Sequence, residues 1–151
     1  QFDKVEMFAY TRPSESENTH QWMVKLEEEI YQRLGIPYRV MLMCSGDLGA
    51  LASKKYDLEF WKPADEVYRE FTSCSNYVDF QARGTNTRYR PEGGGRPQFV
   101  HTLNGTAVAI GRTLIAILEN YQQADGSVVI PAALKPYLPA GLDVIRPRAA
   151  R

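Results

Sequence analysis

The chain has 151 residues and a formal net charge of zero, because 18 lysines and arginines balance 18 aspartates and glutamates. Its 44% hydrophobic content excludes a disordered chain, and no apolar run approaches the roughly 20 residues of a membrane-spanning helix, so we expect one domain and no membrane partner. Proteins that bind nucleic acid unaided usually carry a basic surplus. The neutral charge therefore indicates that any nucleic-acid contact is local or made by other parts of a protein.

Two features concern the location of the protein and how much of it is present. Cys44 and Cys74 are too few for a disulfide framework and lack CxxC spacing, so we expect reduced thiols in a cytoplasmic protein. Residue 1 is Gln, and residues 1–10 begin in the middle of a strand-like pattern. We therefore expect the chain to be a piece of something longer.

Residues 1–10 (QFDKVEMFAY) alternate as a strand does, with Phe2, Lys4, Glu6 and Phe8 on one face. A face that mixes aromatic and charged side chains fits two interpretations. One is an exposed edge with an ion pair between strands, as antiparallel sheets often have. The other is an aromatic platform beside a carboxylate, suited to stacking a base and holding an ammonium group.

A helix is predicted to begin at Ser14, because a glutamate three residues later completes a capping box, and to end at Gly35. Apolar residues recur at every fourth position from Trp22 to Leu34, which predicts a stripe that faces the core. The glutamates at 27–29 are predicted to face solvent.

Strands are predicted next along residues 38–44, 56–62 and 67–75, with short connections between them. The segment PEGGGRP then separates residues 87–90 from residues 98–103, and its glycines and prolines are typical of a hairpin with a flexible tip. Successive strands joined by short turns favour antiparallel pairing.

A second helix is predicted over residues 106–121, directly after a corner made by Gly105, with Arg112 two turns inside it. A short strand follows in VVIP, residues 128–131. Strands outnumber helices in this order, which predicts an α+β fold built on an antiparallel β-sheet.

Familiar catalytic templates are absent from the sequence. It contains no P-loop and no GxSxG motif, and His20 and His101 are too few and too scattered for a zinc site. One polar cluster is REFTSCSN, residues 69–76, which places Glu70 among small hydroxyl side chains. This composition suits a metal–phosphate site or an orienting network, and a polar edge strand would explain it equally well.

A second polar cluster lies in HTLNGTAVAIGR. Asn104 and Thr106 flank the predicted corner, where backbone N–H groups and a helix dipole would attract anions. Arg112 lies on an otherwise apolar helix. It is either a snorkelling or ion-paired arginine, or one that is aimed at a phosphate.

Several uncommon strings occur together in a recognisable order: QFDKVEMF, SGDLG, KKYDLEFW, REFTSCSNYVDFQAR, RYR and HTLNGTAVAIGR. In this order the chain resembles the seryl-tRNA synthetase family, from Gln1 to about Ile145. The resemblance implies a class II aminoacyl-tRNA synthetase core, an antiparallel sheet flanked by helices. It also implies a serine–tRNA ligase, which activates serine with ATP and Mg²⁺ to seryl-adenylate and transfers serine to tRNA(Ser) or tRNA(Sec).

The resemblance also implies which part of such an enzyme is present. Residues 1–151 correspond to the C-terminal portion of the catalytic domain, from the end of motif 2 through motif 3. Three parts are missing: the N-terminal tRNA-binding arm, the first half of motif 2, and motif 1, which builds the homodimer interface. We therefore expect no activity from this chain alone. The family usually has a second Arg where this chain has Gly84, after Arg83.

On the ATP side, the resemblance assigns four residues. Phe2 would stack on adenine, and Arg112 would hold the γ-phosphate. Glu70 would bind ATP and its Mg²⁺, with Ser73 beside it as a second metal ligand. Glu70 and Arg112 would therefore be the catalytic residues.

On the serine side, the resemblance assigns Glu6 to the ammonium group, and Asn104 and Thr106 to the serine side chain. Physical chemistry agrees with this choice, since a side chain as small as that of serine must be selected by hydrogen bonds. Two alternatives stay open at this point. One is a related enzyme that loads a small amino acid onto a carrier protein, and the other is a non-catalytic interaction module.

Overall fold

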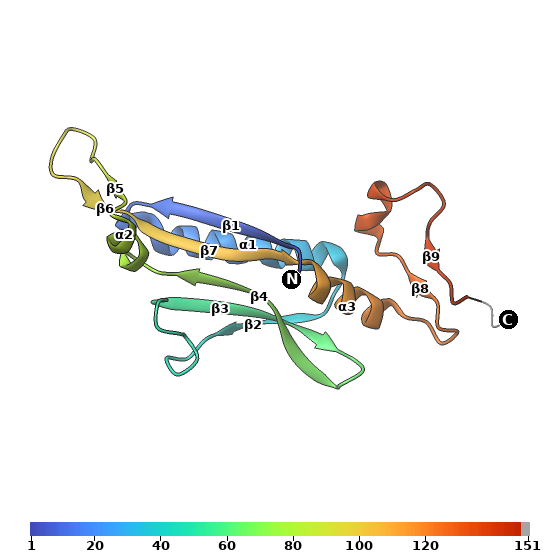
Figure 1. Ribbon diagram of the computed structural model, residues 1–151. Helices are drawn as coiled ribbons and strands as arrows, with labels where there is room; N and C mark the ends of the chain where they lie inside the picture. Colours follow the sequence, from blue (N-terminus) through green and yellow to red (C-terminus); the bar gives the residue numbers. More distant parts are fainter. Residues whose placement is uncertain (149–151) are drawn as a thin grey trace.

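The structure is a computed structural model that describes residues 1–148, and it contains a five-stranded antiparallel sheet with the strand order β1-β7-β4-β3-β2 (Figure 1). Helix α1 lies along one face of the sheet, and α3 continues from the end of β7. The predicted α+β class is confirmed. The bounds are β1 Lys4–Thr11, α1 Ser16–Leu34, β2 Tyr38–Leu42, β3 Lys54–Lys62, β4 Val67–Asn76, β7 His101–Ala109 and α3 Ile110–Tyr121.

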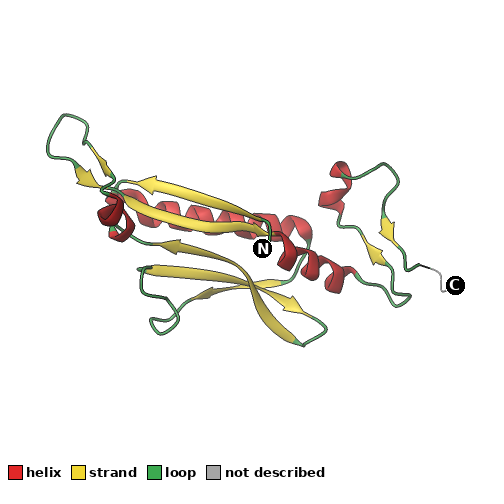
Figure 2. Cartoon of the chain, in the orientation of Figure 1, coloured by secondary structure: helices red, strands yellow, loops and turns green. Residues whose placement is uncertain are grey.

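Smaller elements complete the described chain (Figure 2). The hairpin predicted around PEGGGRP is confirmed as β5 and β6, and Gly93, Gly94 and Gly95 at its tip have φ angles of 85°, 89° and 123°, which suit glycine. Among residues 1–148, no helix has the length and apolar character needed to cross a membrane. The bounds are η1 Pro13–Glu15, α2 Phe80–Thr85, β5 Arg88–Tyr89, β6 Gln98–Phe99, β8 Val128–Val129, η2 Ala132–Tyr137 and β9 Val144–Ile145.

Helix α1 ends where the sequence predicts but begins later. Gly35 follows it in the left-handed conformation, at φ 66°, and donates its N–H to the Gln32 carbonyl at 3.0 Å. At the other end Pro13 opens a 3-10 turn, and the Ser16 hydroxyl donates to the Pro13 carbonyl at 3.2 Å. The capping box predicted at Ser14 is wrong, since no side chain of the described chain caps this helix.

The buried face of α1 differs from the predicted stripe. Trp22 is 58% exposed, and Leu26 and Ile30 lie half-buried at the flank. Glu27, predicted to face solvent, is fully buried, because Gly105 on the facing strand leaves room for its carboxyl group. The prediction followed apolar residues alone and therefore placed the stripe too far around the helix. The buried residues of α1 are Ser16, His20, Met23, Val24, Glu27, Tyr31 and Leu34.

Aromatic side chains form the centre of the core between α1 and the sheet. The rings of Tyr31 and Phe71 have centroids 3.6 Å apart, and Phe60 lies 5.1 Å from Phe71. Because an aromatic side chain buries roughly 150–250 Å², these rings dominate the stabilising burial. Cys74 is buried in the same core and Cys44 is exposed, and both are free thiols, as the sequence predicts.

The second helix begins four residues later than the sequence predicts. Strand β7 continues through Gly105 to Ala109, because it pairs with β1 along its whole length. Helix α3 then starts at Ile110, so the corner predicted at Gly105 is wrong. Arg112 lies in the first turn of the helix, not two turns inside it. Pairing with a distant strand has overridden the local preference of residues 106–109.

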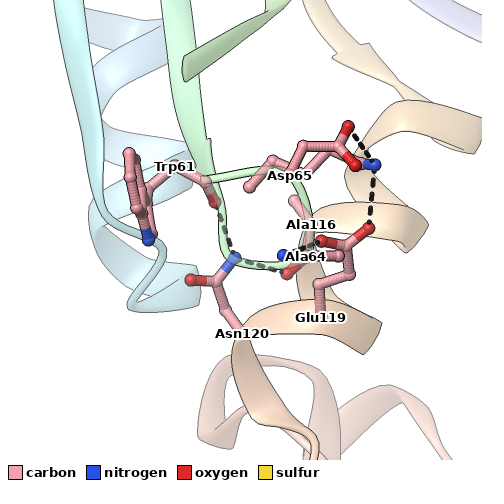
Figure 3. Close-up of polar contacts among 7 residues, drawn as sticks. Trp61, Ala64, Asp65, Ala116, Glu119 and Asn120 are labelled. Carbon is pink, nitrogen blue, oxygen red and sulfur yellow. Dashed lines mark hydrogen bonds and ion pairs between the residues drawn. The ribbon is translucent and has the colours of Figure 1, made fainter. Parts of the chain in front are cut away.

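The turn between β3 and β4 is fastened to the end of α3 by polar contacts (Figure 3). The Asn120 amide donates to the Trp61 carbonyl at 3.1 Å, and the Ala64 N–H donates to the Glu119 carboxylate at 3.1 Å. Lys62 Nζ lies 3.4 Å from the same carboxylate. These contacts hold the hairpin that contains β4 against α3.

Replacing Asn120 with alanine removes the contact to the Trp61 carbonyl. We expect a loss of about 1–2 kcal/mol in the free energy of unfolding, measured by urea denaturation. Asn18→Ala, at an exposed position of α1, is the matched control and should change stability by about 0.5 kcal/mol or less. Equal unfolding midpoints for the two variants would show that the fastening does not stabilise the fold.

Candidate functional site

The face of the sheet opposite α1 carries the polar residues that the sequence singles out. Gly105 and Cys74, paired on β7 and β4, face α1, so their neighbours in sequence face the other way. Residues directly opposite each other in antiparallel strands share a face. One row across four strands is therefore Phe8, Asn104, Ser75 and Lys55, with each neighbouring pair in register.

A second row lies one step along the strands. Glu6 is opposite Thr106, and Ser73 is opposite Asp57. The strand pairing shifts by one residue next to this row. One shift lies between Val5 and Glu6 of β1, and the other between Leu58 and Glu59 of β3. Such bulges bend a strand and re-aim its side chains, and they are frequent next to binding sites.

A cavity of about 510 Å³ lies over this part of the sheet, within the roughly 300–1,000 Å³ typical of small-molecule sites. Glu6 and Asn104 do not line it, although Glu6 is bonded to a residue that does. The beginning of the chain reaches the cavity because the Ile110 N–H donates to the Asp3 carbonyl at 3.2 Å, beside the start of α3 (Figure 1). The predicted site residues that line the cavity are Phe2, Glu70, Ser73, Thr106 and Arg112.

Two neighbours fix the carboxylate of Glu6. The Thr106 hydroxyl donates to Glu6 Oε2 at 2.9 Å, and Lys4 Nζ lies 3.0 Å from the same oxygen. The ion pair lies within β1 rather than between strands. These contacts use one carboxylate oxygen and leave the other to accept a hydrogen bond from an ammonium group.

Arg112 and Glu70 meet at the wall of the cavity. Arg112 Nη1 donates to the Glu70 carbonyl at 3.1 Å and lies 3.3 Å from Glu70 Oε2. Both side chains are about half exposed, and ion pairs of this kind contribute only about 0–1 kcal/mol. A phosphate group can therefore displace Glu70 at little cost, and the first turn of α3 adds a dipole that favours anions.

Asn104 is oriented by a residue that sequence reasoning did not select. The Tyr77 hydroxyl donates to Asn104 Oδ1 at 3.3 Å, just beyond the end of β4. A single tyrosine after a strand gives no local signal of such a role. Only the pairing of β4 with β7 brings the two side chains together.

Asp57 is a second residue that the sequence did not select. Its side chain is almost fully buried, Lys55 Nζ lies 3.6 Å from its Oδ2, and its Oδ1 has no hydrogen-bond partner among residues 1–148. Burial raises the pKa of Asp57, and Lys55 partly offsets this rise. The alternation of residues 56–62 places Asp57 on a polar face. Its position opposite Ser73 follows only from the register of β3 with β4.

Residues 1–121 match the family of the tRNA synthetase class II core domain (G, H, P, S and T). The chain belongs to this family. The predicted class II core is thereby confirmed, and the antiparallel sheet that carries the cavity is part of that core.

Serine–tRNA ligases are similar to this chain over nearly the whole of its 151 residues. The enzyme of Caldanaerobacter subterraneus subsp. tengcongensis is 58% identical over 146 residues, which are 97% of this chain and 34% of the relative. The enzyme of Novosphingobium aromaticivorans is 55% identical over 148 residues, 98% of this chain and 34% of the relative. The chain thus spans about a third of the length of the curated relatives it matches.

Two solved structures share the fold. Seryl-tRNA synthetase from Pyrococcus horikoshii complexed with ATP superposes with a TM-score of 0.94 at 49% identity, covering 98% of this chain and 33% of that one. Cytoplasmic serine–tRNA ligase from Naegleria fowleri in complex with AMP gives a TM-score of 0.88 at 42% identity, covering 97% and 30%. Both similar proteins were solved with an adenine nucleotide.

Proposed function

We propose that this chain is the part of a serine–tRNA ligase that binds ATP and serine. Residues 1–151 form the C-terminal portion of the class II catalytic domain, from the end of motif 2 through motif 3, and motif 1 and the N-terminal tRNA-binding arm lie outside them. One observation carries the proposal. A single cavity joins the ring of Phe2 and the Arg112–Glu70 pair to Thr106, whose hydroxyl is bonded to Glu6.

The ATP half of the site uses Phe2, Glu70, Ser73 and Arg112. The ring of Phe2 is 74% exposed and free to stack on adenine, a contact worth about 1–3 kcal/mol for a base on an aromatic side chain. Arg112 exchanges Glu70 for the γ-phosphate, to which it donates charge-assisted hydrogen bonds. Glu70 and Arg112 touch ATP in this arrangement and are the catalytic residues of the proposal.

The serine half uses Glu6, Asn104 and Thr106. Glu6 accepts hydrogen bonds from the ammonium group, and Thr106 and Asn104 bond the side-chain hydroxyl of serine. Tyr77 holds the amide of Asn104 in place. An analogue without the hydroxyl leaves these polar groups unpaired, which is the strongest form of selection available for a small substrate.

The residues that are present fit Mg²⁺ bound together with ATP. Glu70 offers a carboxylate and Ser73 a hydroxyl, both hard oxygen ligands that line the same cavity. Within the described chain, no group of three or more His, Cys, Asp or Glu residues forms a metal cage. A pair of protein ligands is enough for Mg²⁺, which commonly completes its shell with substrate phosphates and water. When bound, the ion neutralises phosphate charge.

The proposed reaction has two steps. A carboxylate oxygen of serine attacks the α-phosphorus of ATP and the bond to pyrophosphate breaks, which gives seryl-adenylate and pyrophosphate. A hydroxyl at the 3′ end of tRNA then takes the seryl group and AMP leaves. Protein groups position the reactants and neutralise charge in both steps, so the chemistry requires no covalent intermediate on the chain.

The partners follow from the same proposal. The complete protein charges tRNA(Ser) and tRNA(Sec), works as a homodimer and is cytoplasmic. The neutral charge of this chain is consistent with tRNA binding mainly by another part of the complete protein. The relatives described above are serine–tRNA ligases, and no observation favours the carrier-protein ligase as a second candidate.

Serine-dependent exchange of label between pyrophosphate and ATP tests the proposal in the complete protein. We expect exchange with serine and far less with alanine or glycine. Thr106→Val keeps the shape of the side chain but removes the donor to Glu6, so it should raise KM for serine about 10- to 100-fold. Thr85→Val, at an exposed position of α2, is the matched control. Equal exchange with serine, alanine and glycine would contradict the proposed substrate.

A further inference from the structure

Glu27 is an acidic residue that the proposed reaction does not use. It lies in α1, on the opposite side of the sheet from the cavity, and its side chain is 0% exposed. The Thr72 hydroxyl donates to Glu27 Oε2 at 3.1 Å. Its other oxygen, Oε1, finds no hydrogen-bond partner in the part of the chain that the structure describes. A buried carboxyl group in such surroundings needs an explanation.

Glu27 reaches β7 because residue 105 is glycine. A Cβ atom on Gly105 would lie 2.6 Å from Glu27 Oε1 and 3.0 Å from Cys74 Sγ. The carboxyl group therefore lies directly against the backbone between Asn104 and Thr106. The side chains of Asn104 and Thr106 face the opposite side of the sheet. Glu27 therefore contacts the backbone of the proposed serine site from the α1 side.

The same part of α1 also contacts the strand that carries the ATP side of the site. Thr72, the partner of Glu27, is next to Ser73 on β4 and lines the cavity. Tyr31 lies one turn further along α1 and donates to the Ala107 carbonyl at 3.3 Å, at the bulge of β7. Two polar side chains of one helix thus hold β4 and β7 where both pass under the cavity.

We propose that Glu27 is a positioning residue for serine, and that in its neutral, protonated form it sets the spacing of β4 and β7 beneath Asn104 and Thr106. The inference rests on the proposed function. An ionised carboxylate here would be buried without a cation, so it would draw in water or move away from Gly105. Either change would shift the backbone that carries the serine contacts.

The charges around Glu27 support the neutral form. Burial raises the pKa of Glu27 from its ordinary 4.5 to about 8, and the hydrogen bond from Thr72 lowers it only in part. The carboxylates of Glu6 on β1 and Asp57 on β3 raise it further. The other titratable groups near it are Tyr31 and, two turns away, His20 on α1, and Cys74 on β4. Because its pKa is raised, the stability that Glu27 contributes is present at low pH and is lost as the pH rises towards about 8.

The test is the pH profile of serine-dependent exchange in the complete protein and its Glu27→Gln variant. The ratio of wild-type to variant kcat/KM for serine should be flat below about pH 8 and should fall about tenfold per pH unit above it. The ratio of the two profiles removes the ionisation of serine itself. Glu29→Gln, two residues along α1 and exposed, is the control and should follow the wild type.

The possible results distinguish the positioning role of Glu27 from the proposed function. Coincident profiles for the wild type and Glu27→Gln overturn the positioning role while leaving the proposed function intact. If Glu27→Gln does not fold, Thr72→Val replaces it, since losing that donor raises the pKa of Glu27 and should move the alkaline decline to higher pH; an unmoved decline overturns the inference. A wild type without serine-dependent exchange at any pH overturns the proposed function and this inference together.

Discussion

Replacing Arg112 with alanine is expected to lower kcat/KM for ATP in pyrophosphate exchange by about 10²- to 10³-fold. Arg112 lies at the cavity wall in the first turn of α3, where its guanidinium pairs with Glu70, and the proposed function places the phosphates of ATP beside it. Alanine leaves the negative charge of the leaving pyrophosphate without this partner. Steady-state kinetics with ATP as the varied substrate measure the loss.

Two further variants define the role of the guanidinium. Arg112→Lys keeps the charge but loses the planar fork, so its activity should lie between wild type and alanine. Arg33→Ala removes an exposed arginine of α1 that pairs with Glu29, and it should leave the ATP kinetics unchanged. Unchanged kinetics in Arg112→Ala would show that this side chain does not bind ATP.

Gly105→Ala is expected to destabilise the fold by about 1–3 kcal/mol, because a new methyl group would lie 2.6 Å from Glu27 Oε1 and 3.2 Å from Cys74 Cβ. The strand must move away from α1 to relieve the overlap. This movement displaces the backbone on either side, so KM for serine should rise as well. Urea denaturation and serine kinetics measure the two effects.

A double-mutant cycle locates the cause of that loss. Combined with Glu27→Ala, the Gly105→Ala change should cost about 0.5–3 kcal/mol less than it does alone, since the obstructing carboxyl group is gone. Gly84→Ala is the control, because a Cβ there meets nothing within 4 Å in residues 1–148 and helix α2 gains a better helix former. If the effects of Gly105→Ala and Glu27→Ala on the free energy of unfolding simply add, the overlap with Glu27 is not the cause of the destabilisation.

Local patterns were sufficient to predict much of the fold. Alternation in residues 56–62 predicted β3, the composition of residues 67–75 predicted β4, and the glycines of PEGGGRP predicted the hairpin, because these signals depend only on neighbours in sequence. The start of α3 could not be predicted in this way. It depends on how far β7 pairs with β1, a strand about a hundred residues earlier.

The candidate site could likewise be predicted only in part from the sequence. Strings such as REFTSCSN and HTLNGTAVAIGR selected residues, and the structure gathers five of the seven around one cavity. The rows in which they lie follow from strand register, which composition does not encode. Glu27 was missed for a related reason, since a glutamate on a helix usually faces solvent. Only Gly105 on a distant strand makes space for it.

The hairpin of β3 and β4 and the helix α3 are joined by polar contacts beside the cavity. Glu70 belongs to the hairpin and Arg112 to the helix, while the contacts of Asn120 and Glu119 hold the two together at the far end (Figure 3). In the proposed function a phosphate draws Arg112 away from Glu70, and we expect this exchange to change the rotamer of one side chain while the helix stays in place. The binding free energy is then reduced only by the ordering of that side chain, about 0.5–1.5 kcal/mol, rather than by the movement of a whole element.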